Sequence, residues 1–160
     1  MVRESVEPSP RRRVVILEDN DDRQDAFREI LAERFPMFEL CFAVTSGEGV
    51  RLIDEALDRI AMAILDNDLD VLQTSFGKSV DAGDGIQVAE YLSRRPPTFP
   101  VVVHTTNTPA RERIVNLLTT AGWAVSTVVP YGDLEWIGKE WFRAVANAIK
   151  EHPPDAVQGP

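Results

Sequence analysis

The stretch of sequence that most limits the fold is an apolar run, residues 60–65, which ends abruptly at Asp66. Apolar and polar side chains do not alternate in it, so a strand formed here is covered on both faces, as central strands of parallel α/β sheets are. Ligands of such sheets collect at the carboxyl ends of the strands. Asp66 is therefore expected at a functional site.

A second apolar run, residues 14–17, leads directly into Glu18 and Asp19. If the two strands are neighbours, these carboxylates converge with Asp66, and like charges so close require a cation between them or raised pKa values. Oxygen ligands favour Mg²⁺ or Mn²⁺ over zinc. The alternative is that acids at strand ends only cap helices or lie in solvated turns.

Composition indicates one globular domain and limits its partners. The chain has 160 residues, of which 44% are hydrophobic, and its net charge is −9. This charge argues against general binding to nucleic acid or to an anionic membrane. No run approaches 18 apolar residues, and the one cysteine, Cys41, cannot form an internal disulfide. We therefore expect a soluble, cytoplasmic protein.

Hydrophobic periodicity predicts five strands alternating with five helices. The predicted strands are 13–17, 38–44, 61–65, 99–107 and 124–129, and the predicted helices are 22–35, 46–60, 85–95, 108–121 and 133–149. Asp84 is expected to cap the third helix and Thr108 the fourth. This alternation favours a single doubly wound, five-stranded parallel sheet of order 2-1-3-4-5, a flavodoxin-like three-layer α/β sandwich, in which strands one and three are neighbours.

The remaining segments flank or interrupt this domain. Residues 1–11 are expected to form a disordered leader, 12–150 the domain, and 151–160 a disordered tail. The segment of about 69–83 lacks periodicity and exceeds the usual loop length, so we expect a lid over the acidic pocket. Within it, Lys78 could reach the acids or remain a solvated loop lysine.

Polar residues that suit a phosphate follow the fourth predicted strand. His104 could act as a general acid or base, or be a buried core histidine. Strand alternation allows only one of His104 and Thr105 to point fully at the pocket. Asn107 could donate to a phosphoryl oxygen beside the free N–H groups of the next helix, and Arg111 could clamp an anion or lie on the surface.

With these residues in place, the chain from about 13 to 150 resembles a receiver domain of the response-regulator (CheY-like) superfamily. The resemblance implies that Glu18, Asp19 and the backbone carbonyl of Asp68 hold Mg²⁺, beside Asp66 as phosphoryl acceptor and Thr105 (or Thr106) as switch hydroxyl. Receivers place a lysine before the proline that follows the fifth strand. This sequence has Val129 there, so Lys78, an arginine or the metal must supply the charge, or the phosphoryl switch is lost.

A narrower resemblance accounts better for these departures. Leu65-Asp66-Asn67-Asp68-Leu69, Gly85-Ile86-Gln87-Val88 and the stretch 103–113 are similar to divergent receivers proposed to process cyclic phosphates. That group has a histidine where this chain has Asn67, whereas His104 and Asn107 are kept. An amide cannot move protons near neutral pH, so catalysis needs another group.

These patterns support three hypotheses of different kinds. The first is an atypical stand-alone receiver-like signalling domain that binds Mg²⁺ (or Mn²⁺) and recognises or processes a phosphate-bearing small molecule. The second is a phosphorelay response regulator in which a phosphodonor protein or small phosphodonor phosphorylates Asp66. The third is a phosphate-independent interaction module. Because receivers often bind partners beside strand five, where Trp136 is expected to be at most partly covered, a homodimer or partner surface is also considered there.

Overall fold

The computed structural model describes residues 11–69, 72–73 and 79–153. Five parallel strands form its main sheet, in the order β2-β1-β3-β6-β7. They are β1 (Arg13–Leu17), β2 (Glu39–Ala43), β3 (Ile60–Leu65), β6 (Val101–His104) and β7 (Val125–Val128). The predicted order 2-1-3-4-5 is confirmed, with β1 and β3 side by side.

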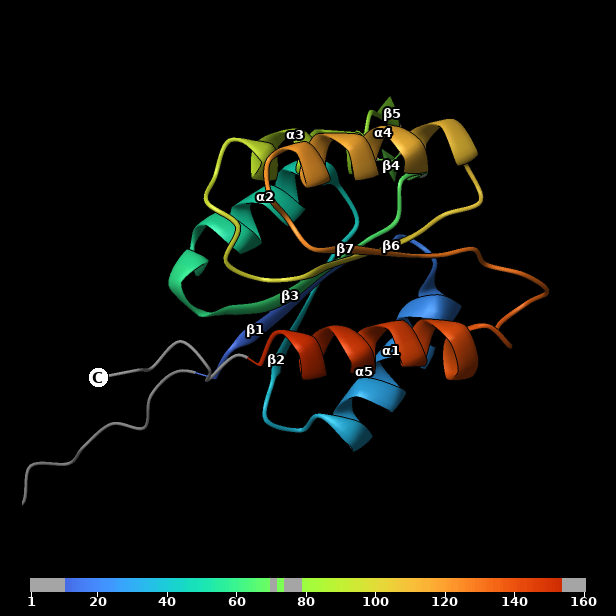
Figure 1. Cartoon of the computed structure of the whole chain (residues 1–160). Helices are drawn as coiled ribbons and strands as arrows, with labels where there is room; N and C mark the ends of the chain where they lie inside the picture. Colours follow the sequence, from blue (N-terminus) through green and yellow to red (C-terminus); the bar gives the residue numbers. More distant parts are fainter. Residues whose placement is uncertain (1–10, 70–71, 74–78, 154–160) are drawn as a thin grey trace, which may run out of the picture.

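Helices cover both faces of this sheet (Figure 1). α1 (Asp21–Arg34) and α5 (Phe142–Glu151) lie on one face, and α2 (Ser46–Asp54), α3 (Gly85–Ser93) and α4 (Thr108–Thr120) lie on the other. A 3₁₀ turn, η1 (Leu57–Arg59), precedes β3, and a π-helical turn, η2 (Ile137–Trp141), leads into α5. The molecule is therefore the three-layer α/β sandwich that the sequence predicts.

Two apolar cores hold the layers together. Every side chain of β3 is buried, and from Met62 to Leu65 alternate residues pack on opposite sides. Ala63 and Leu65 contact the layer of α2, α3 and α4, whereas Met62 and Ile64 contact the layer of α1 and α5. Burial on both faces explains why the sequence of this strand shows no polar alternation.

The predicted starts of the second, third and fourth helices are confirmed, and only the cap residue of the fourth differs from the prediction. Thr45 caps α2, and Asp84 caps α3 through a reciprocal capping box with Gln87. The cap of α4 is Asn107 instead of Thr108, because the Asn107 side chain accepts the backbone N–H of Ala110. β6 accordingly ends at His104, three residues before the predicted end of the strand.

The last predicted helix is the least accurate element. It was expected from residue 133, but helical structure begins only with η2 at Ile137. The insertion at about 69–83 contains a two-residue antiparallel pair, β4 (Leu72–Gln73) with β5 (Ser79–Val80). Lys78, nearly all of the predicted leader and most of the predicted tail lie outside the described residues. The lid therefore stays a prediction.

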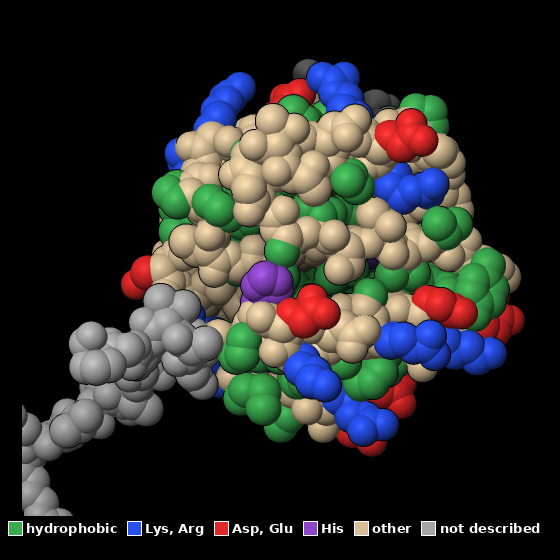
Figure 2. Space-filling view, in the orientation of Figure 1, with side chains coloured by type: hydrophobic (Ala, Val, Ile, Leu, Met, Phe, Trp, Pro, Cys, Tyr) green, Lys and Arg blue, Asp and Glu red, His purple; other side chains and the backbone are tan. Residues whose placement is uncertain are grey.

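One face of the molecule is mixed in charge. On the face that Figure 2 shows, Lys and Arg side chains are interspersed with Asp and Glu side chains. Among the described residues, helices long and apolar enough to cross a membrane are lacking.

Candidate functional site

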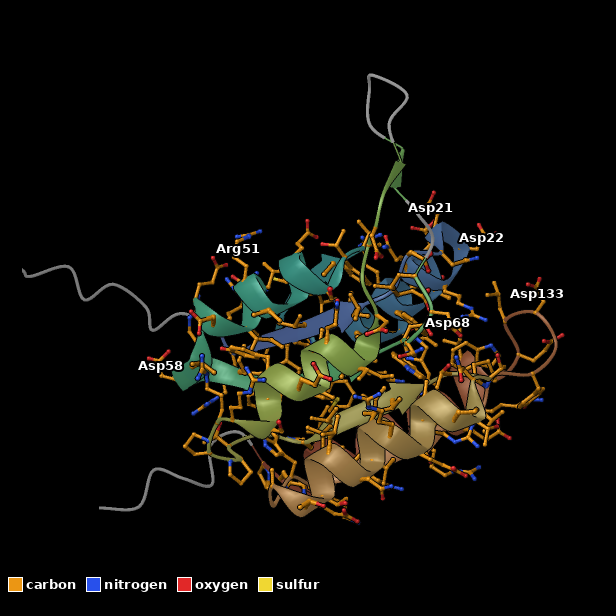
Figure 3. All side chains as sticks on the ribbon, turned by 90° about the horizontal axis from the view of Figure 1, so that it is seen from above. Asp21, Asp22, Arg51, Asp58, Asp68 and Asp133 are labelled. Carbon is orange, nitrogen blue, oxygen red and sulfur yellow. The ribbon has the colours of Figure 1, made fainter. Side chains whose placement is uncertain are left out.

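The sheet register brings three polar residues to one edge. Leu17 pairs with Leu65, and Leu65 pairs with Val103. The next residue of each strand is therefore level with the others at the carboxyl edge of the sheet, and these residues are Glu18, Asp66 and His104. Figure 3 shows Asp68, just beyond β3, at the same end of the molecule as Asp21 and Asp133, with Asp58 at the opposite end.

Glu18, Asp66 and His104 form a compact buried cluster. Each offers a ligand atom within 4.8 Å of the others, and their exposed fractions are 0%, 6% and 0%. Nε2 of His104 lies 3.0 Å from Oε1 of Glu18, and Nδ1 of the same ring has no hydrogen-bond partner within the described structure. Strand alternation allowed either His104 or Thr105 to point at the pocket, and His104 is the one directed at the acids.

Burial and charge set the ionisation of the two acids apart. Desolvation and the neighbouring charge of Glu18 raise the pKa of Asp66 to about 8. Burial also opposes ionisation of Glu18, but its hydrogen bond with His104 and the charge of Arg23 hold the pKa of Glu18 below its ordinary value. At neutral pH and without a cation, Glu18 is therefore ionised while Asp66 is mainly protonated.

The backbone after β3 is fixed by a close contact with α3. The N–H of Gly85 donates to the carbonyl oxygen of Asn67 at 3.1 Å. A Cβ atom on Gly85 would lie 2.4 Å from the carbonyl oxygen of Asp66, so only glycine fits without a shift. The N–H of Asn67 in turn donates to Oδ1 of Asp66 at 2.7 Å. Gly85 thus allows α3 to support the turn that carries the acidic residue.

Asp68 and Asn107 link this turn to the start of α4. Nδ2 of Asn107 donates to Oδ1 of Asp68 at 3.1 Å, and Nδ2 of Asn67 donates to the same oxygen at 2.9 Å. Asp68 is exposed and lies outside the buried cluster. Its side chain joins two loops, and its expected role as a metal ligand through its backbone stays a prediction.

Thr105 and Arg111 stabilise the loop after β6. The hydroxyl of Thr105 accepts the N–H of Asn107 at 3.1 Å, and this residue is only 2% exposed. Nη1 of Arg111 lies 3.3 Å from the Thr105 carbonyl oxygen, and its Nη2 lies 3.4 Å from the hydroxyl of Thr108. The guanidinium of Arg111 therefore folds back onto its own loop.

Arg23 is a residue of the site that the sequence does not single out. Nη1 of Arg23 lies 3.5 Å from Oε1 of Glu18 and 3.9 Å from Oδ2 of Asp66. The residue is the third of α1, and its backbone N–H is fixed by the side chain of Asn20. Its position in the sequence could have indicated this contact, because a side chain in the first turn of a helix lies next to the end of the preceding strand.

The expectation that Trp136 lies near the surface is wrong, since this residue is 0% exposed. Its indole lies 5.3 Å from the guanidinium carbon of Arg23 and 5.6 Å from the ring of His104. The π-helical hydrogen bond from the N–H of Trp141 to the carbonyl of Trp136 explains the error. Residues five apart share a face in a π turn but diverge in an α-helix.

The other predicted positions are less central. Asp19 is half-buried and is not one of the three clustered ligands, although its charge contributes to the raised pKa of Asp66. Val129, at the position of the receiver lysine, is 51% exposed. Its side chain therefore neither fills nor neutralises the buried cluster.

A cavity of about 470 Å³ adjoins the acidic turn. It lies between the starts of α3 and α4 and is lined by residues of both and of the turn after β3, among them Asn67, Asp68, Asp84, Asn107 and Arg113. The cavity is therefore bounded by both acidic and basic side chains, namely Asp68, Asp84 and Arg113.

The donor set fits a divalent cation. Two carboxylates suit Mg²⁺ or Mn²⁺, and the nitrogen of His104 favours Mn²⁺ within that pair. The raised pKa of Asp66 is also consistent with a cation site. Burial disfavours the ionised form of this carboxylate, and a bound cation would stabilise it.

A family model for the cyclic-phosphate processing receiver domain matches residues 14–120. No curated protein matches the chain significantly.

Solved structures of receiver domains share the fold. The signal receiver domain of an HD domain-containing protein from Pseudomonas fluorescens Pf-5 has a TM-score of 0.64 at 12% identity, with 89% of this chain and 98% of that chain covered. A CheY-like receiver domain protein from Methanospirillum hungatei JF-1 has a TM-score of 0.61 at 17% identity, covering 89% and 99%. The response regulator domain of Thermotoga maritima CheB has a TM-score of 0.64 at 16% identity, covering 88% and 98%.

Proposed function

Because the chain belongs to the cyclic-phosphate processing receiver family, we propose that it binds a small phosphate ester, a cyclic phosphate in particular, together with a divalent cation. The observation that carries this proposal is the convergence of Glu18, Asp66 and His104 at the carboxyl edge of the sheet. When both buried carboxylates are ionised they need a counter-charge, and a cation that they hold attracts a phosphate.

In this proposal, different residues bind the ion and the phosphoryl group. Glu18 and Asp66 hold the ion, with Asp19 and Asp68 adding negative charge beside it. When bound, Mg²⁺ or Mn²⁺ supplies positive charge for phosphoryl oxygens. Asn107 lies at the start of α4 within reach of Asp68, so its amide can orient a phosphoryl group there.

Binding is better supported than turnover. A general acid or base must reach the reacting atoms, and His104 is 0% exposed with Nε2 directed at Glu18. Asn67 stands where the related group has a histidine and cannot carry a proton near neutral pH. We therefore expect recognition of a phosphate ester with slow turnover or none.

A thermal and calorimetric titration tests this function. We expect Mn²⁺ with 2′,3′-cyclic AMP to raise the melting temperature of the full chain more than Mn²⁺ alone. Asp66→Asn should lose the ligand-induced rise, whereas Asp58→Asn, which removes the same charge from an exposed site at the opposite end, should keep it. No rise with Mn²⁺, inorganic phosphate or the cyclic nucleotide would leave a phosphate-independent interaction module as the better account.

Phosphorylation of Asp66 is the second candidate. The position of this carboxylate at the end of β3, with Oδ1 held by the N–H of Asn67, suits a phosphoryl acceptor. The exposed Val129 in place of lysine argues against it. Acetyl phosphate with Mg²⁺ should add a phosphoryl group that Asp66→Asn abolishes if this candidate is right. We expect no phosphoryl adduct. Binding of a phosphodonor protein, or of a second copy of the chain, stays a prediction.

A further inference from the structure

The buried cluster lacks the lysine that receivers use, yet a basic side chain lies over it. Nη1 of Arg23 is 3.5 Å from Glu18 and 3.9 Å from Asp66. It reaches them from the first turn of α1, whereas the receiver lysine comes from the loop after the last strand. Its side chain is 27% exposed, so part of it is accessible to solvent.

The distances from Arg23 to the two carboxylates show that it forms a short, strong hydrogen bond with neither of them. Charge-assisted hydrogen bonds between nitrogen and a carboxylate oxygen are about 2.7–2.9 Å long. Both contacts of Arg23 are longer, whereas His104 approaches Glu18 to 3.0 Å. The primary buried partner of Glu18 is therefore the histidine, and the guanidinium is placed above the pair.

An aromatic surface holds the guanidinium in this position. Its carbon lies 5.3 Å from the ring centroid of Trp136, within the range of a cation–π contact. Trp136 is itself immobilised, since it is fully buried and its indole N–H donates to the carbonyl of Asp133 at 3.2 Å. A fixed indole face thus orients a planar side chain that carries five N–H donors.

We propose that Arg23, positioned by Trp136, is the phosphate-binding cation of this site and takes the place of the receiver lysine. This inference rests on the proposed function. A guanidinium matches two phosphoryl oxygens at once, which an ammonium does not. A phosphate that bridges Arg23 and an ion held by Glu18 and Asp66 also relieves the repulsion between these two positive charges.

The alternative role for Arg23 is only to neutralise the acids. The two roles differ in the effect that Arg23→Ala should have on phosphate binding. As a phosphate ligand, Arg23→Ala should weaken binding of 2′,3′-cyclic AMP and of inorganic phosphate by about 10- to 100-fold in the presence of Mn²⁺. Binding of Mn²⁺ alone should stay equal or become tighter, since a neighbouring positive charge is removed. Arg23→Lys should recover part of the phosphate affinity because it keeps the charge without the planar geometry.

Arg28→Ala is the matched control. Arg28 also lies on α1 and stacks over an aromatic ring, that of Phe42 at 4.6 Å, and it forms an ion pair with Asp25. We expect this variant to bind both phosphate probes as the wild type does. A difference between the two alanine variants would therefore reflect the acidic cluster instead of general loss of charge from α1.

Trp136 needs a readout of its own, because its substitution also affects the core. Trp136→Phe keeps a buried aromatic ring but weakens the cation–π contact. We expect ligand binding to change the tryptophan fluorescence of the wild type, and we expect Trp136→Phe to lose this change and to bind phosphate several-fold more weakly. Trp123 and Trp141 remain in this variant as the unresponsive background.

Two results would overturn this assignment in different ways. If wild type binds the phosphate probes and Arg23→Ala binds them equally well, Arg23 is not the phosphate ligand while the proposed function stands. If the wild type binds neither probe with or without Mn²⁺, the proposed function fails and the role of Arg23 fails with it.

Discussion

Replacing Asp66 by asparagine should stabilise the metal-free protein, and more so as the pH rises. The pKa of Asp66 in the fold is about 8, against 3.8 for an ordinary aspartate. Its contribution to stability is fully present below pH 3.8 and is lost as the pH rises through 8, because the unfolded chain ionises this group first. At ~1.36 kcal/mol for each unit of pKa, this difference sets an upper bound of about 6 kcal/mol.

We expect about 2–3 kcal/mol of this to be measured, because the fold and water relax around a charged carboxylate. The asparagine side chain does not titrate, so Asp66→Asn removes the contribution of this residue to the pH dependence while keeping an oxygen for the N–H of Asn67. At pH 8.5 the variant should melt roughly 5–10 °C above the wild type, and the gap should shrink towards pH 4.

Urea unfolding of both proteins in EDTA between pH 4.5 and 9 measures this difference. Asp58→Asn is the control, since its carboxylate is exposed and lies at the other end of the molecule. Parallel curves for the wild type and Asp66→Asn, or a variant less stable than the wild type at pH 8.5, would refute the assignment of a buried, protonated Asp66.

Three further results are expected. Mn²⁺ affinity should rise about tenfold per pH unit up to pH 8 and then level off, because binding releases the proton of Asp66; a flat calorimetric profile would contradict this. Gly85→Ala should lower the free energy of unfolding by about 1–3 kcal/mol, since its Cβ would meet a carbonyl oxygen at 2.4 Å, whereas Gly47→Ala has open space and should not. His104→Ala should lower it by about 3–5 kcal/mol by leaving a buried carboxylate without its partner, and equal unfolding midpoints for His104→Ala and the exposed-site control His152→Ala would exclude that role.

The sheet could be predicted because its strands carry local signals. A fully apolar run such as residues 60–65 requires cover on both faces, and an acid directly after it marks the carboxyl edge. The order of strands then follows from right-handed crossovers, which place β1 beside β3. Convergence of Glu18 and Asp66 is a consequence of this order and of the register between Leu17 and Leu65.

The parts that could not be predicted depend on side-chain reach and on departures from regular helix geometry. A helical stripe of period 3.6 places Trp136 off the core face, and only the π turn brings it inward with Trp141. Arg23 occupies a first-turn position typical of solvated residues, but its long side chain turns back over the acids. Which of His104 and Thr105 faces the acids depends on side-chain direction at the end of β6, which strand alternation alone leaves open.

Anomalous diffraction from crystals grown with Mn²⁺ tests most directly whether Glu18 and Asp66 share a cation. We expect one strong peak between their carboxylates, at about 2.1 Å from an oxygen of each. A peak elsewhere, or none at an Mn²⁺ concentration that saturates binding in solution, would show that the acids at this edge do not form a metal site.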